Sequence, residues 1–357
     1  MPRFYPLQVV SVEPETREAV TVTLQADPEN QDKFHFTQGQ YLTFRSEIDG
    51  EEVRRSYSIC APAQEQVLRV GIKQVEDGRF STFANQQLKP GDSIEAMPPM
   101  GSFFTQLDSD QKKHYVAFVG GSGITPVLSI IKTTLRAEPE STFALFYGNR
   151  ATASIMFKEE LEDMKNAYLG RFQLVHVLER EAQDIELFNG LLDQEKCAAL
   201  LKHWSDASSI DTAFLCGPEA MMLQASQALQ DAGVDKSRIK FELFSTPGEN
   251  RGQAPRREKQ ASTGKVCQAT IVLDGHSRDI NLGKDDQSIL DAALEQGIEA
   301  PYACKGGVCS TCRALLTEGE VEMDANFALE DYEIQRGYIL TCQSFPITDK
   351  VVVDYDK

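Results

Sequence analysis

The chain has 357 residues, of which 41% are hydrophobic and 25% charged, a composition typical of an ordinary globular protein with two or three domains. Its formal net charge of −18 argues against nucleic acid as a partner and favours a protein with a basic docking surface. No apolar run is long enough to cross a bilayer, and the N-terminal residues lack the pattern of a secretory signal. We therefore expect a cytoplasmic protein whose eight cysteines are reduced or bound to metal.

The first hundred residues consist of short alternating runs of polar and apolar residues. Examples are Val20–Leu24, Tyr41–Phe44 and Leu68–Ile72, which are separated by turn sequences such as Asp49-Gly50 and Asp77-Gly78. This pattern predicts a small antiparallel β-barrel, to which we assign residues 1–106.

From about His114 the pattern changes to apolar strands that alternate with helices. The expected strands are 115–119, 143–147, 172–178, 213–215 and 241–244, and the expected helices start at Pro126 and Pro218 or cover 158–168 and 194–204. This alternation predicts an α/β domain, 107–246, with a doubly wound parallel sheet covered on both faces.

Residues 247–264 contain almost no large apolar side chain, and we predict that they form a flexible linker. The third domain, 265–357, begins with a predicted hairpin of strands 268–273 and 278–282 around Asp274-Gly275. A helix over 288–296, a cysteine-rich loop and strands around 338–342 and 351–355 follow. Acidic residues outnumber basic residues about two to one in this domain.

The cysteine-rich loop has the spacing of a plant-type [2Fe–2S] site. Cys304, Cys309 and Cys312 follow the pattern C-x4-C-x2-C, and Cys342 is the distant fourth ligand. Gly306 lies inside this loop, and we expect it and the following glycine to let the backbone turn its N–H groups toward the sulfurs.

A structural zinc ion is the main alternative, because four cysteines also suit Zn²⁺. Zinc ligands usually come as two short pairs, whereas this sequence provides three cysteines together and one apart. The remaining cysteines, Cys60, Cys197, Cys216 and Cys267, are scattered, and we interpret them as small buried residues.

A polar segment at a strand end of the barrel is a candidate flavin site. Arg55 and Tyr57 alternate along the strand and share one face, where Arg55 suits a diphosphate and Tyr57 suits a flat ring. Ser58 is near enough to hydrogen-bond the edge of such a ring. An exposed strand with a polar face explains these residues equally well.

Two glycine-containing turns are candidate phosphate sites. The segment Gly78–Thr82 precedes a helical stretch, where it is either a phosphate-binding helix start or an ordinary cap. The segment Gly120–Pro126 follows a strand and opens a helix, with Thr125 as the expected N-cap and Pro126 at the first helical position. Cys216-Gly217-Pro218 repeats this strand-to-helix pattern, and ligands gather at such strand ends.

On these motifs the chain resembles the ferredoxin–NADP reductase superfamily, over essentially its whole length. It is most similar to oxygenase reductases in which a flavin barrel, a nicotinamide domain and a C-terminal ferredoxin are fused. The resemblance implies a β-grasp fold for the ferredoxin domain. Pro99–Phe103 resembles the end of FAD-binding barrels, which implies FAD rather than FMN.

The resemblance also implies roles for individual residues. Ser58, Thr125, Cys216 and Glu242 are implied to lie at the site of hydride transfer. The cofactor-binding residues implied in the barrel are Arg55, Tyr57, Ser58, Val70, Ile72, Gly78, Phe80, Ser81 and Thr82. Those implied in the nicotinamide domain are Gly120, Gly121, Ser122, Gly123, Thr125, Arg150, Cys216, Gly217, Pro218 and Phe244.

The expected activity is electron transfer from NAD(P)H through FAD to the [2Fe–2S] cluster, and then to an oxygenase. Arg150 suits the 2′-phosphate of NADPH, whereas Glu179 suits the ribose hydroxyls of NADH, and we favour NADPH. Reductases of phenylacetyl-CoA epoxidase provide the nearest resemblance, which implies a di-iron epoxidase as the recipient. One alternative is that the electrons go to a different oxygenase or to a hybrid-cluster protein. Another is that the chain is a zinc-stabilised binding module on a vestigial flavin fold.

Overall fold

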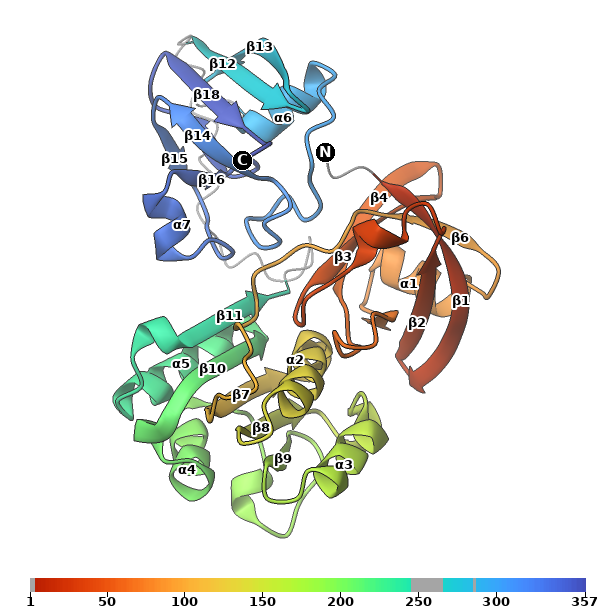
Figure 1. The fold of residues 1–357 in the computed structure, drawn as a ribbon, viewed down its shortest axis with the longest axis vertical. Helices are drawn as coiled ribbons and strands as arrows, with labels where there is room; N and C mark the ends of the chain where they lie inside the picture. Colours follow the sequence, from red (N-terminus) through yellow and green to blue (C-terminus); the bar gives the residue numbers. More distant parts are fainter. Residues whose placement is uncertain (1–3, 245–265, 285–286) are drawn as a thin grey trace. The chain divides into compact units, whose positions relative to one another are not determined.

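The computed structural model describes residues 4–244, 266–284 and 287–357 (Figure 1). Its contacts divide the chain into two compact units that meet in sequence at Phe244 and Ser245. The first unit holds the barrel and the α/β domain, and the second holds the C-terminal domain. The expected linker, 247–264, lies outside the described residues.

The barrel is a six-stranded antiparallel sheet with strand order β4-β3-β6-β1-β2-β5. Its elements are β1 (Tyr5–Thr16), β2 (Ala19–Ala26), β3 (Tyr41–Ile48), β4 (Glu51–Ser58), β5 (Leu68–Lys73), α1 (Arg79–Gln86) and β6 (Ser93–Ala96). A bridge between Ile59 and Val70 joins the ends of the two outer strands and closes the barrel. The alternating residues face one apolar core, which confirms the predicted fold of this region.

The α/β domain has a five-stranded parallel sheet with strand order β11-β10-β7-β8-β9. Its strands are β7 (His114–Gly120), β8 (Thr142–Asn149), β9 (Phe172–Leu178), β10 (Ile210–Gly217) and β11 (Ile239–Leu243). Its helices are α2 (Ile124–Ala137), α3 (Lys158–Ala167), α4 (Gln194–Trp204) and α5 (Glu219–Asp231).

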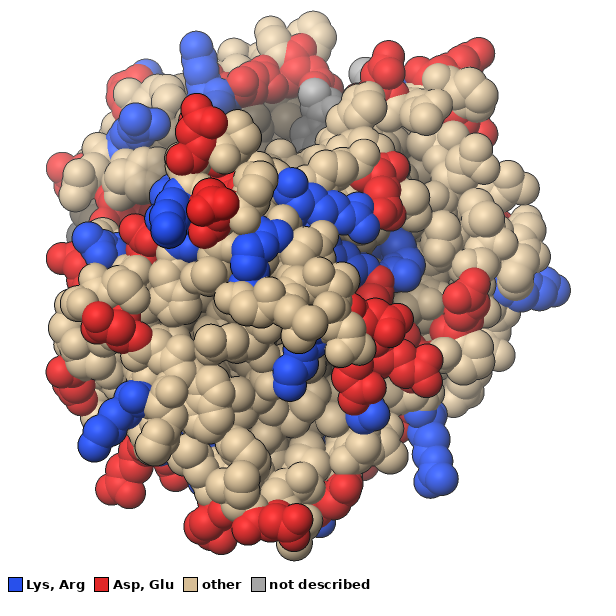
Figure 2. All heavy atoms as spheres, turned by 60° about the horizontal axis from the view of Figure 1, so that its bottom comes forward, with Lys and Arg blue, Asp and Glu red and all other residues tan. Residues whose placement is uncertain are grey.

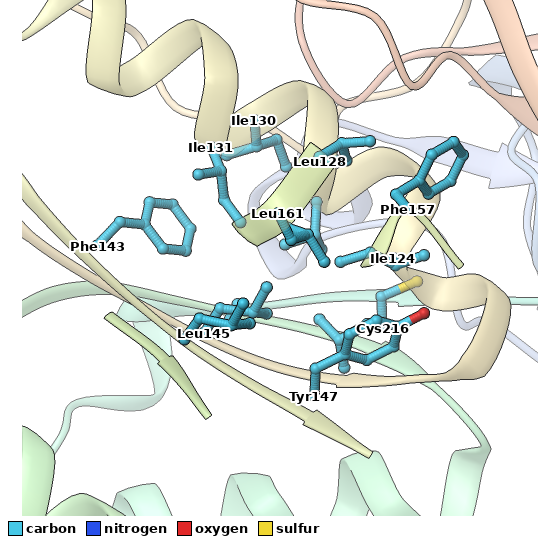
Figure 3. Packing of buried hydrophobic residues seen from close by; sticks show 14 of the residues in the cluster. Ile124, Leu128, Ile130, Ile131, Phe143, Leu145, Tyr147, Phe157, Leu161 and Cys216 are labelled. Atoms are coloured by element: carbon cyan, nitrogen blue, oxygen red, sulfur yellow. The ribbon is translucent and has the colours of Figure 1, made fainter. Parts of the chain in front are cut away.

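Both faces of this sheet are covered, as the strand–helix alternation predicts. Residues of α2 and α3 pack with Tyr115 and Val119 on one face, and residues of α4 and α5 pack with Val116 and Phe118 on the other. Figure 3 shows part of the first cluster, with Leu128 of α2 and Leu161 of α3 beside Leu145 of β8. Alternate residues of β7 therefore enter different cores, which is why this strand reads as one continuous apolar run.

The C-terminal domain has a five-stranded sheet with strand order β13-β12-β18-β14-β16, in which only the β12–β18 pair is parallel. Its elements are β12 (Val266–Leu273), β13 (His276–Gly283), α6 (Ile289–Glu295), β14 (Arg313–Glu318), β15 (Val321–Met323), α7 (Asp331–Gln335), β16 (Tyr338–Leu340), β17 (Ser344–Pro346) and β18 (Lys350–Asp354). The hairpin turn has positive φ at Asp274 and Gly275, as the sequence predicts. One helix packed on this mixed sheet confirms the expected β-grasp ferredoxin domain.

Charged side chains of both signs lie close together at several points of the face shown in Figure 2. Among the described residues, no helix has the length and the apolar character that a membrane span requires.

Candidate flavin, nicotinamide and cluster sites

The end of β4 places the three expected flavin residues in different surroundings. The Tyr57 ring lies 5.4 Å from the Phe80 ring, centroid to centroid, and burial raises the pKa of Tyr57 above its usual range. The Arg55 guanidinium is half-buried and donates a hydrogen bond to the Arg54 carbonyl at 2.7 Å. Ser58 is buried, and its hydroxyl donates to Glu242 Oε2 at 3.4 Å. The strand therefore supplies an aromatic ring, a cation and a hydroxyl within four residues.

The segment before α1 is a compact turn. A Cβ on Gly78 would lie 2.4 Å from Ser81 Oγ, so a side chain at this position would collide with the turn. Ser81 Oγ donates to the Gly78 carbonyl and accepts from the Val75 N–H, so this hydroxyl already has partners inside the turn. The geometry supports the cap interpretation, and a phosphate role for this segment stays a prediction.

The side chains of the other expected barrel residues mainly pack inside the barrel or bond within it. Phe80, Val70 and Ile72 are buried in the barrel core, where Phe80 supports Tyr57. Because the side chains of Val70 and Ile72 are in the core, these two residues could contact a ligand only through their backbone atoms. Thr82 accepts a 3.4 Å hydrogen bond from Gln74.

The glycine-rich turn differs from the prediction at the start of its helix. Gly121–Gly123 form a 3₁₀ turn, and α2 begins at Ile124 with Gly123 as the N-cap. The expectation that Thr125 is the N-cap and Pro126 the first helical residue is therefore wrong. Three small residues can themselves turn helically, so the helix begins early, and the Thr125 hydroxyl donates to the Ser122 carbonyl at 3.0 Å.

The two nicotinamide motifs meet because β7 and β10 are neighbours in the sheet. A Cβ on Gly123 would lie 2.3 Å from the Cys216 carbonyl oxygen, and a Cβ on Gly120 would lie 2.6 Å from Pro218 Cδ. Gly217, at a φ of +152°, has the Gly120 backbone nitrogen 2.8 Å from its ideal Cβ position. Glycine is thus required at three positions for the turns to come together, which the spacing alone did not indicate.

The side chains below this turn fix it to the apolar core. The Tyr147 hydroxyl donates to the Gly121 carbonyl at 2.9 Å. Figure 3 shows Cys216 and Tyr147 at the end of the core cluster nearest Ile124, where α2 begins. The glycine turn therefore rests on packed side chains.

Four residues expected at the hydride-transfer site come from four separate segments, and the fold brings them together. Cys216 on β10 is paired in register with Glu242 on β11, and Glu242 accepts the hydrogen bond from Ser58 of the barrel. Thr125 lies against β5, since its Cγ2 is 2.9 Å from the ideal Cβ position of Gly71. The joint face of barrel and α/β domain thus carries all four.

Burial controls the electrostatics of this group. Burial raises the pKa of Glu242 to about 8, and the Ser58 hydroxyl offsets part of the rise. Burial and the Glu242 carboxylate raise the pKa of the Cys216 thiol well above its ordinary value. Both groups are therefore protonated near neutral pH in the protein without a bound cofactor. Phe244, beyond the end of β11, is exposed.

The carboxyl ends of β8 and β9 carry charged groups that sequence reasoning found only in part. Arg150 is exposed, and its charge helps to lower the pKa of Lys73, for which burial is the larger cause. Lys73 was missed, although its place at the end of β5, one residue after Ile72, could have indicated it. The Glu18 carboxylate acts in the opposite direction and raises the pKa of Lys73, so both signs of charge lie near this lysine.

A second missed contact stabilises the loop after β8. Thr152 donates its backbone N–H and its hydroxyl to the Glu181 carboxylate, both at 2.7 Å, and these hydrogen bonds lower the pKa of Glu181. Glu179 is engaged by Arg180 at 3.3 Å. These contacts hold the carboxyl ends of the two strands in one arrangement.

The four cluster cysteines are grouped as two pairs. The Cys309 thiol donates to the Cys304 sulfur, and together with backbone N–H groups it lowers the pKa of Cys304 to about 6. The Cys312 thiol donates to Cys342 in the same way. The Gly306 N–H points at the Cys304 sulfur at 3.3 Å, as the sequence predicts.

This pairing fits a two-iron cluster. A [2Fe–2S] cluster takes two thiolates on each iron, whereas structural zinc gathers four ligands around one ion. Together with the spacing of three cysteines and one apart, this grouping makes the zinc alternative unfavoured.

Four contacts around the cluster loop were not found from the sequence. Gln343 donates to the Lys305 carbonyl at 2.9 Å and lies 3.8 Å from the Cys342 sulfur. The Tyr355 hydroxyl donates to Thr341, which in turn donates to the Cys312 carbonyl at 2.9 Å. The four remaining cysteines are buried, as expected.

Comparisons with known proteins agree with this three-part organisation. Residues 6–105 match the oxidoreductase FAD-binding domain family, 118–227 the oxidoreductase NAD-binding domain family, and 271–346 the 2Fe-2S iron-sulfur cluster binding domain family. These matches support FAD, NAD(P)H and a [2Fe–2S] cluster as the cofactors.

The chain is 44% identical over 356 residues to one subunit of the 1,2-phenylacetyl-CoA epoxidase of Escherichia coli, covering 100% of this chain and 99% of that protein. It is 31% identical to the ferredoxin reductase component of 3-ketosteroid-9-alpha-monooxygenase from Rhodococcus rhodochrous, covering 98% and 96% of the two chains. The solved structure of phthalate dioxygenase reductase has the same fold, with a TM-score of 0.59, 22% identity and 98% of both chains covered. The chain therefore belongs to the ferredoxin–NADP reductase family, as an NAD(P)H-dependent oxygenase reductase component with flavin, nicotinamide and C-terminal [2Fe–2S] domains.

Proposed function

We propose that this chain uses NADPH to supply electrons to the oxygenase component of a phenylacetyl-CoA epoxidase. The 44% identity to a subunit of that enzyme over the whole chain supports this choice of partner. The convergence of Ser58, Cys216 and Glu242 on one face carries the proposed chemistry. When bound, FAD accepts a hydride, which carries two electrons, and the [2Fe–2S] cluster passes electrons onward one at a time.

The residues of the chain bind, orient and protect the reactants. Gly120 and Gly123 let the glycine turn pack directly against Pro218 and Cys216, which fixes the turn over which the nicotinamide nucleotide would bind. Thr125 borders the face where barrel and α/β domain meet. Tyr57 would hold the flavin ring by aromatic contact, and Arg55 would bind its diphosphate. Ser58 Oγ, Cys216 and Glu242 line the position of the nicotinamide, and the core below them excludes water.

Glu242 holds a proton at this face. Because its pKa is raised to about 8, its carboxyl is protonated at neutral pH, with Oε2 accepting from Ser58 Oγ. Ser58 would connect this carboxyl to the edge of a bound flavin ring, an arrangement that would suit proton transfer at that edge. Cys304, Cys309, Cys312 and Cys342 hold the cluster as two pairs.

Arg150 and Lys73 support NADPH over NADH, because both bring positive charge to the carboxyl ends where the 2′-phosphate would bind. The same assignment places the FAD-binding barrel at 1–106, the nicotinamide domain at 107–246 and the ferredoxin domain at 265–357. None of the eight cysteines forms a disulfide, which suits the reducing cytoplasm where NADPH is supplied.

Reconstitution tests the proposal. The purified chain, NADPH and the oxygenase component of phenylacetyl-CoA epoxidase should together consume phenylacetyl-CoA, and omission of any one should stop turnover. If the oxygenase stays oxidised while cytochrome c is still reduced, the proposed partner is wrong. A higher kcat/KM with NADH would refute the choice of NADPH.

A further inference from the structure

The segment between the cluster loop and β16 exposes several large apolar side chains. Phe327 is 45% exposed, and Tyr332 and Ile334 on α7 are 52% and 39% exposed. Exposed apolar side chains that gather in one region often mark a site of interaction with a partner. We call 327–334 the exit segment.

The exit segment is tied directly to the cluster loop. The Phe327 N–H donates to the Gly307 carbonyl at 3.0 Å, and the Ala325 carbonyl oxygen lies 2.9 Å from the ideal Cβ position of Gly307. Gly307 stands between Cys304 and Cys309, which are half-exposed, whereas the other two cluster cysteines are buried. The accessible side of the cluster site is therefore the side on which Phe327 lies.

The charge around the exit segment indicates which class of partner could bind there. Residues 313–336 contain seven Asp and Glu and two Arg, of which Arg313 pairs with the buried Glu333 and Arg336 lies over the Tyr332 ring. The whole domain, residues 265–357, contains 17 acidic and 8 basic residues, so its net charge is clearly negative. A second copy of this surface or an anionic membrane would be repelled, and so would nucleic acid. A protein with an apolar centre and a basic rim is complementary.

We propose that the exit segment and the loop 304–309 form the surface on which the oxygenase component docks to receive electrons. This inference rests on the proposed function, because it assumes a protein acceptor. Phe327 and Ile334 are the apolar anchors, and the acidic side chains of 314–335 guide the basic rim of the partner toward the half-exposed cysteine pair.

The test uses the full holoprotein with the single variants Phe327→Ser and Ile334→Ser. Ile347→Ser is the matched control, because Ile347 is 53% exposed in the same domain but its backbone bonds to Glu320 and Lys284, not to the cluster loop. The acceptors are the oxygenase component of phenylacetyl-CoA epoxidase and, separately, cytochrome c, whose basic rim surrounds an exposed haem edge. Visible spectra and the rate of cluster reduction by NADPH are recorded for every variant.

We expect the KM for the protein acceptor to rise about tenfold in Phe327→Ser and Ile334→Ser, with the spectrum and internal cluster reduction unchanged. Added salt should raise the wild-type KM as well. An unchanged KM, an equal rise in Ile347→Ser, or slower internal cluster reduction at constant KM would each overturn the proposal. If the wild-type protein reduces cytochrome c but not the epoxidase, the proposed partner is wrong. The KM of each variant for cytochrome c then still tests the docking surface.

Discussion

Replacement of Gly123 by alanine tests whether the close approach of two turns positions the nicotinamide. The added Cβ would lie 2.3 Å from the Cys216 carbonyl oxygen and 2.6 Å from its carbonyl carbon. Both are main-chain atoms of the buried strand β10, so no side-chain rotation relieves the clash. The turn must move until the shorter contact grows from 2.3 Å to at least 3.0 Å, an unavoidable shift of the backbone at the site.

The cost of this shift can be estimated. Overpacking of this kind destabilises a protein by about 1–3 kcal/mol. For a unit of this size each kcal/mol lowers the melting temperature by about 2–4 °C, so we expect a decrease of about 2–12 °C. Misplacement of reacting groups approaching 1 Å slows a reaction by up to about a hundredfold, so flavin reduction by NADPH should slow by about ten- to a hundredfold.

Anaerobic stopped-flow absorbance of the flavin measures this rate, and thermal unfolding measures stability. Gly170→Ala is the control, because Gly170 has a φ of +79° and nothing within 4 Å of its ideal Cβ position. It should lose about 1–2 kcal/mol of stability from backbone strain alone and reduce its flavin at the wild-type rate. Wild-type flavin reduction in Gly123→Ala would refute the claim that this contact sets the hydride geometry.

Three further predictions concern the cluster, the buried carboxyl and the nucleotide. Cys309→Ser should lose iron and the visible absorption of the cluster while flavin reduction by NADPH continues, and retained iron would contradict the assignment. Glu242 has a raised pKa, so the folded wild type binds the extra proton and loses stability as pH rises from about 4.5 to about 8, by roughly a few kcal/mol at most. Glu242→Gln should lack this loss, so its melting temperature should exceed that of the wild type at pH 9 by more than at pH 5; a constant difference would show that Glu242 does not titrate in this range. Arg150→Ala should raise the KM for NADPH about tenfold or more and leave that for NADH unchanged, whereas an equal rise for both would place Arg150 on a group that the two nucleotides share.

Sequence patterns predicted the local features of this protein well, because each depends on a few consecutive residues. The 3.6-residue period placed α4 at Gln194–Trp204, and the Asp274-Gly275 turn fixed the register of the β12–β13 hairpin. The short elements β15, β17 and α7 were missed, since three to five residues carry no measurable period. The wrong N-cap at Thr125 has a related cause, because glycines give no helix signal even when they adopt helical turns.

The candidate sites show where sequence information ends. Ser58 and Glu242 are 184 positions apart, and their hydrogen bond depends on the placement of β4 of the barrel against β11 of the parallel sheet. The same holds for Lys73 and Arg150, whose like charges interact only because the end of β5 faces the loop after β8.

The pairing of the cluster cysteines is a further case, and it also bears on function. Spacing identifies four ligands, but only the fold shows that Cys304 and Cys309 form the accessible pair while Cys312 and Cys342 are buried beneath Tyr355 and Thr341. An electron acceptor that must approach the cluster from outside therefore meets one pair and not the other. The exposed Phe327 lies in the segment bonded to Gly307 of the same loop, so an acceptor that approaches the accessible pair would meet this segment as well.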